Sequence, residues 1–131
     1  MMTQEDKDLL LKDICARLPH GVKIAMPGLW DREITVEPLN EIFKGDDGLY
    51  RANASGMLIE YIKPYLFPLS SMSEEQEIEY DATFATIIYE DGRKDSAMTD
   101  KSFDWLNANH FDYRGLIQKG LAIDATNLNI Y

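Results

Sequence analysis

Apolar positions near the amino terminus recur with the spacing of an α-helix. The side chains that would form the inner face of this helix are Leu9, Leu10, Ile14 and Leu18. Thr3 followed by acidic residues is a typical helix start, so the pattern predicts a helix over residues 4–18. Pro19 and Gly21 end it, because proline cannot continue the hydrogen-bond ladder and glycine tolerates a left-handed turn. Cys15, the single cysteine, is expected on the inner face as a small buried hydrophobe.

Short apolar runs separated by turn residues follow this helix. Ile34 and Val36 alternate with polar neighbours, which is typical of a half-buried strand. The Gly45-Asp46-Asp47-Gly48 run indicates a turn, and a further apolar segment follows it. Residues 22–62 are therefore predicted to form a small antiparallel sheet of about three or four strands.

Two different patterns follow one another after residue 62. Residues 63–73 contain two prolines and no periodicity, so we expect an extended connection there. Ser73 and Gln76 form the pattern of a capping box, which predicts a second helix that continues to the Asp91-Gly92 pair. A strand is the alternative, because apolar positions also alternate over residues 78–84.

A third helix is predicted from Thr99 through Ala108. Asp112 is placed to cap a last short helix, which Gly120 would close before a terminal apolar segment over residues 121–123. The chain is therefore expected to be one α+β domain, residues 1–131, with an amino-terminal helix, a small antiparallel sheet and two or three carboxy-terminal helices packed on it.

The composition limits the classes of function. With 131 residues, 45% of them hydrophobic, the chain can bury one core without a metal or a disulfide. Its net charge is −10, and ten acids against three bases between Glu74 and Asp104 supply −7 of that. Such a surface repels phosphates, which argues against direct binding of DNA or RNA. An acidic amino terminus and the absence of a long apolar run predict a cytoplasmic protein that does not enter a membrane.

The residues richest in chemistry lie between Trp105 and Gly115. His110 could act as a general base oriented by Asp112, with Arg114 as the cationic group of a catalytic site. The structural alternative is that Asn109 and His110 end one helix, Asp112 caps the next, and Arg114 pairs with an acid. No spacing of His, Cys, Asp or Glu matches a zinc or calcium site and no phosphate-binding loop is present, so neither a metal nor a cofactor is expected.

Aromatic and arginine side chains are enriched at binding surfaces, and the same stretch contains several of them. The candidate binding residues are Trp105, Asn109, His110, Tyr113 and Arg114. Most aromatic residues of a chain of this size are needed for the core. Trp30, beside Asp31 and Arg32, is the aromatic residue expected to be partly exposed.

Three segments together indicate a family resemblance: LPHGVK, YIKPYLFPLSSMSEEQ and WLNANHFDYRGLIQKGLAID. The chain resembles a family of small uncharacterised proteins encoded by gut Bacteroides-type bacteria and by their prophages and mobile elements. The likeness spans nearly the whole length except residues 39–56, and its last segment is the most specific. It implies a bacterial or phage origin and assigns no catalytic residue.

These observations favour a non-enzymatic accessory protein that binds another protein, through the surface near Trp105 to Arg114 or through the acidic face. Two alternatives stay open. One is a DNA mimic, which would need acids spaced like phosphates over an extended face. The other is a small enzyme that uses His110 and Asp112.

Overall fold

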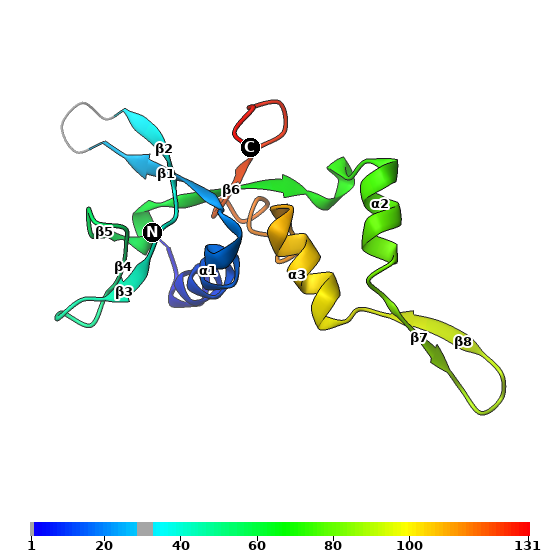
Figure 1. Ribbon diagram of the computed structural model, residues 1–131. Helices are drawn as coiled ribbons and strands as arrows, with labels where there is room; N and C mark the ends of the chain where they lie inside the picture. The colour runs from blue at the N-terminus through cyan, green and yellow to red at the C-terminus, as the bar shows by residue number, and fades with distance from the viewer. Residues whose placement is uncertain (1, 29–32) are drawn as a thin grey trace.

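Three α-helices and a set of short strands make up the part of the chain that the computed structural model describes, residues 2–28 and 33–131. The α+β class predicted from the sequence is confirmed. Trp30 lies outside the described residues. Figure 1 shows that α1 and α3 lie beside a long central strand, β6, while a hairpin extends away from the other elements.

Helix α1 (Gln4–Arg17) begins and ends as the sequence predicts. The side chain of Thr3 accepts a hydrogen bond from the Asp6 N–H, and Gly21 adopts a left-handed φ of 71° after a short 3₁₀ turn, Leu18–His20. The buried face was predicted less well, because it consists of Leu10, Asp13, Ile14 and Arg17. This orientation points Cys15 to solvent, so the prediction of a buried cysteine was wrong.

The main sheet is built around β6 (Lys63–Pro68), in the segment that we expected to be an extended connection. Its strand order is β10-β6-β1-β2, and β9 also pairs with β6. The other strands are β1 (Lys23–Pro27), β2 (Ile34–Pro38), β9 (Phe111–Asp112) and β10 (Ile123–Asp124). Strands β1 and β2 are antiparallel to their neighbours, but β9 and β10 run parallel to β6. The sheet is therefore mixed. Strands within residues 22–62 pair antiparallel as expected, but they are divided between two sheets, and this sheet also includes strands from outside those residues.

The prolines of β6 explain why a central strand was not predicted there, since proline lacks the N–H that a ladder needs. In the structure each neighbour pairs with β6 over two positions only. Pro64 pairs with Ile24 of β1, and Pro68 pairs with Asp112 of β9. The partner strand changes along β6, so each proline lies at the end of one short pairing.

A second, three-stranded sheet contains β3 (Ile42–Lys44), β4 (Tyr50–Ala52) and β5 (Met57–Leu58). Its first turn is the predicted one, with the Gly48 N–H donating to the Gly45 carbonyl. The segment after β5 forms a 3₁₀ turn, Ile59–Tyr61, that contacts α1. The main hydrophobic core lies where α1 meets this sheet, β1, β6 and the carboxy-terminal segment; it includes Leu10, Ile14, Ile24, Ile62, Leu66, Leu116 and Leu121.

The predicted second helix is only half as long as expected. Its capping box is present, with Ser73 and Gln76 bonded to each other's backbone N–H, but α2 (Glu74–Asp81) ends at Asp81. Residues beyond it form an antiparallel hairpin of β7 (Ala85–Ile88) and β8 (Lys94–Ala97). Three β-branched residues in succession, Thr86, Ile87 and Ile88, disfavour a helix there and suit a strand.

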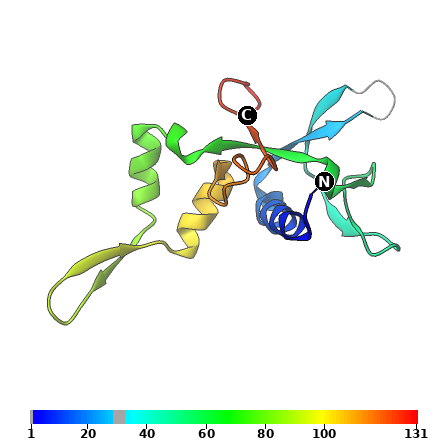
Figure 2. The same cartoon turned by 180° about the vertical axis from the view of Figure 1, so that it is seen from behind.

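We call residues 74–97 the arm. In Figures 1 and 2, seen from opposite sides, the β7–β8 hairpin of the arm stands clear of the other elements. Every residue of β7 is exposed. Helix α2 of the arm contacts α3 (Asp100–Ala108), the third helix, which begins after Thr99 as predicted. The helix predicted after Asp112 does not form, and turns occupy residues 116–120 instead.

Candidate functional site

Trp105 lies on α3 and connects that helix to the arm. Its ring stacks on Phe111 at 5.6 Å between centroids, and Tyr80 of α2 lies 5.5 Å away on another side. The indole Nε1 donates to Glu79 at 3.3 Å. Trp105 is half-buried between aromatic neighbours, so most of its ring packs against the protein.

Asn109 and His110 form the corner at the end of α3, as the structural alternative proposes. The Asn109 amide donates to the Trp105 carbonyl, and His110 adopts a left-handed φ of 64°. The His110 ring stacks on Tyr131 with centroids 3.7 Å apart. The Tyr131 hydroxyl in turn donates to the Tyr65 carbonyl of β6, which attaches the end of the described chain to the sheet.

Burial lowers the pKa of His110 to about 4, with smaller contributions from the charges of Arg17, His20 and Lys23. The imidazole is therefore neutral at pH 7. A general base is most effective when its pKa lies near the operating pH, and a pKa this low makes His110 a weak base. Its Nδ1 atom is buried and has no hydrogen-bond partner among the described residues.

Asp112 does not orient His110. One carboxylate oxygen accepts from the Leu116 N–H at 3.0 Å, and the other accepts from the Ile117 N–H at 2.9 Å. Asp112 thus caps the turn that follows it, as the sequence indicated, although that turn does not continue into a helix. Both oxygens are occupied by backbone groups, which is the arrangement of a structural carboxylate.

Tyr113 and Arg114 belong to a buried charge cluster with two residues of α1. Asp13 accepts a 2.9 Å hydrogen bond from Arg17 and a 2.8 Å hydrogen bond from Arg114. Arg17 is fully buried and also donates to the Phe111 carbonyl at 2.6 Å. The Tyr113 ring lies 5.3 Å from the Arg17 guanidinium and 4.5 Å from that of Arg114, within the range of cation–π attraction.

The structure therefore brings Tyr113 and Arg114 together with Asp13 and Arg17, which the sequence analysis did not select. The sequence does contain one signal that Asp13 and Arg17 are buried together. Asp13 and Arg17 are four positions apart and, with Leu10 and Ile14, they occupy one face of a helix. A charged pair within a stripe of apolar positions is typical of a buried ion pair.

Several exposed apolar and acidic side chains lie on the arm. Ile78 of α2 is 70% exposed and Ile88 of β7 is 69% exposed, and Ile87 and Tyr89 are exposed to a lesser degree. Helix α2 adds five carboxylates, and none of them forms a salt bridge with a residue in the described ranges. The arm thus presents apolar and acidic side chains to solvent.

The root of the arm is held firmly. The Thr99 hydroxyl donates to the Thr83 carbonyl at 2.8 Å, and the Thr83 hydroxyl donates to Ser102 at 2.8 Å. Ser102 is fully buried on α3. The hairpin therefore projects from a fixed base.

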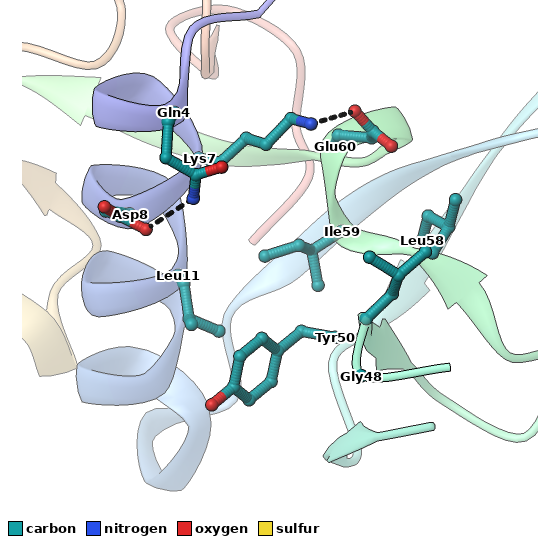
Figure 3. A pocket seen from close by; sticks show the side chains of 10 residues that line it. Gln4, Lys7, Asp8, Leu11, Gly48, Tyr50, Leu58, Ile59 and Glu60 are labelled. Atoms are coloured by element: carbon teal, nitrogen blue, oxygen red, sulfur yellow. Dashed lines mark hydrogen bonds and ion pairs between the residues drawn. The ribbon is translucent and has the colours of Figure 1, made fainter. Parts of the chain in front are cut away.

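A cavity of about 250 Å³ lies between α1 and the second sheet. Figure 3 shows its apolar wall, which includes Leu11, Tyr50 and Ile59. The polar side chains at its rim pair with each other, Lys7 with Glu60 at 3.1 Å and Gln4 with Asp8 at 2.9 Å. A second, shallower hollow lies at the root of the arm, beside Thr83, Phe84 and Thr99. His110, Asp112 and Arg114 line neither the cavity nor this hollow.

Within residues 2–28 and 33–131, no group of three or more His, Cys, Asp or Glu side chains is arranged to hold a metal ion. No helix of this part of the chain has the length and apolarity to cross a membrane. Comparison with family models, with curated proteins and with solved structures found no match to the chain.

Proposed function

We propose that the protein is a non-enzymatic accessory module that binds another protein through the arm. The observation that carries this proposal is the exposure of Ile78 and Ile88, 70% and 69%, on elements with few neighbours. Burial of exposed apolar surface by a partner drives most protein–protein association. Burying one such isoleucine in an interface contributes roughly 1.5–3 kcal/mol.

The isolation of the hairpin supports the same proposal. Strands β7 and β8 form a sheet of two strands that no third strand from residues 2–28 or 33–131 extends. A two-stranded hairpin is marginally stable in water by itself, and additional packing surface stabilises it. A bound partner would supply that surface, while the hydrogen bonds of Thr83 and Thr99 hold the hairpin in position.

The charge of the arm favours a partner with a basic surface. Five carboxylates on α2 have no salt-bridge partner in the described ranges, so a partner carrying Lys or Arg could pair with them. A DNA mimic would need a face of acids alone. Ile78 and Ile88 interrupt the acids of the arm with apolar surface, which suits a protein partner better.

The contacts of the residues around His110 support the alternative function, that of a small enzyme, less well than they support a structural role. Asp112 is bonded to backbone N–H groups, and Arg114 is paired with Asp13. These residues complete the carboxy-terminal corner and hold it against α1. We further infer a bacterial cytoplasmic setting, in a host that carries a prophage or mobile element, from the family resemblance of the sequence.

The proposal is tested by site-specific photo-crosslinking in cells that produce the protein naturally. A photoreactive amino acid replaces Ile88 in the arm or, as a matched control, Ile34 of β2, which is 65% exposed. We expect one defined crosslinked protein from position 88 and none from position 34. The same products from both positions, or none from position 88, would contradict the proposal.

A further inference from the structure

The hairpin of the arm has two outer edges, and their chemistry follows from its register. The Tyr89 N–H donates to the Arg93 carbonyl at 2.9 Å, and Thr86 is paired with Ser96 three positions further from the turn. Bonded and non-bonded pairs alternate along an antiparallel ladder. The alternation turns the backbone of Thr86 and Ile88 outward from β7, and that of Lys94 and Ser96 outward from β8.

The outer edge of β8 is protected. The outward N–H of Ser96 donates to the carboxylate of Asp95 at 2.8 Å, so one of its donors is already occupied. Lys94 and Asp95 also place two charges on this short strand. Charged side chains and occupied donors are the usual means of preventing another strand from pairing with an edge.

The outer edge of β7 lacks both protections. The run from Phe84 to Tyr89 contains no charge, no proline and no glycine, and its β-branched and aromatic residues suit a strand. No described residue accepts a hydrogen bond from the outward N–H of Thr86 or Ile88. Strand β7 thus presents open backbone donors and acceptors beside exposed apolar side chains.

We propose that the open edge of β7 binds its partner by strand addition, and that the added strand is an extended basic segment of another protein. This inference rests on the proposed function of the arm and specifies how the arm binds. Backbone hydrogen bonds would supply affinity, and side chains at alternate positions would supply specificity.

Charge complementarity identifies the occupant. A strand laid along β7 ends near Asp81 on one side and near Glu90 on the other, and α2 adds its carboxylates. Asp91 is not counted among these acids, because its carboxylate is already paired with Arg93. Lys or Arg at the ends of the added strand would meet these acids. A second copy of the chain is a poorer occupant, because each copy carries a net charge of −10.

The test measures binding of a synthetic peptide, in which Val alternates with Lys and Thr, to the whole protein. Fluorescence anisotropy of the labelled peptide at low salt gives the dissociation constant. Thr86→Pro removes an outward N–H of β7 without removing a bond of the hairpin ladder. Ser96→Pro makes the matched change on β8. We expect Thr86→Pro to bind the peptide about tenfold more weakly than the wild type does, because it loses one backbone hydrogen bond and its ring hinders close approach of the added strand. Ser96→Pro should bind the peptide as tightly as the wild type does.

Amide exchange provides a readout that does not depend on the folding of a variant. In the wild type, addition of the peptide should slow exchange at the Thr86 and Ile88 amides while Ser96 is unaffected. No binding by the wild type, or binding without this protection, would overturn strand addition by a basic segment. So would self-association of the wild type that Thr86→Pro abolishes, because the occupant would then be a second copy.

The same assay separates the inference from the proposed function. If Ile88→Glu loses binding while Thr86→Pro retains it, the arm binds through its side chains and strand addition is wrong. If neither change affects binding, both proposals fail.

Discussion

Asp13 and Arg114, 101 positions apart in the sequence, form a 2.8 Å ion pair that joins α1 to the carboxy-terminal segment. The same carboxylate also holds Arg17, and neither Asp13 nor Arg17 is accessible to solvent. The single carboxylate of Asp13 thus pairs with two cations, Arg17 and Arg114. A buried charge that loses its partner is strongly destabilising.

Asp13→Asn should therefore lower the free energy of unfolding by about 3–5 kcal/mol, because Arg17 would remain buried with its charge uncompensated. The control is Glu60→Gln, the same chemical change in the partly exposed pair with Lys7, which should cost under about 1 kcal/mol. Urea denaturation of both variants measures the difference. Similar losses in the two variants would show that Asp13 does not have this role.

His110 should make stability depend on pH. Its pKa is about 4 in the folded protein and 6.5 without the fold, so the unfolded state binds more protons between these values. Stability should be fully present above about pH 6.5 and should fall toward pH 4, by about 1–2 kcal/mol after allowance for partial solvent screening.

The matched variant is His110→Asn, since asparagine tolerates the positive φ of this residue and does not titrate. The stability difference between the wild type and this variant, measured across the pH range, isolates the contribution of His110. A difference that is constant from pH 4 to pH 7 would refute the assignment.

Gly92→Ala should loosen the hairpin and leave the rest of the protein unaffected. Gly92 has a φ of 84°, which suits glycine, and its N–H closes the turn by donating to the Tyr89 carbonyl. An alanine there costs about 1 kcal/mol or more in local strain. Amide exchange in β7 and β8 should accelerate while the urea midpoint stays unchanged. A large shift of the midpoint would mean that the hairpin is part of the global folding unit.

The carboxylates of α2 should contribute to binding and to its salt dependence. Reversing Glu75 and Glu77 to lysine should weaken partner binding about tenfold and flatten its dependence on salt. The control reverses Glu41 and Asp46, exposed acids outside the arm, for the same change in net charge. Equal effects of the two double variants would attribute the result to net charge alone.

The sequence predicted what local patterns determine. The caps at Thr3 and Ser73 and the turn at Gly45 to Gly48 each depend on neighbouring residues, and each forms as expected. Strand β6 could not be predicted in this way, because its prolines argue against a central strand and only the tertiary structure supplies three different short pairings.

The hairpin of the arm was missed for a different reason. The Ser73 box is a strong helix signal, and it led us to extend α2 through residues where β-branched side chains and the Asp91-Gly92 turn favour a hairpin. At the candidate site, the corner role of Asn109, His110 and Asp112 was foreseen as an alternative. Pairing of Arg114 with an acid was foreseen as part of the same alternative. The acid was not identified as Asp13, since nothing local specifies a contact over 101 positions.

The proposed function requires that the arm is the binding surface. The decisive measurement is the dissociation constant, by calorimetry, of the crosslinked partner for the wild type, for Ile88→Glu and for Ile34→Glu. These changes add the same charge at two isoleucines of similar exposure, 69% and 65%. We predict that Ile88→Glu weakens binding by about tenfold or more and that Ile34→Glu leaves it unchanged. Unchanged binding by Ile88→Glu, or equal weakening by both, would contradict the account.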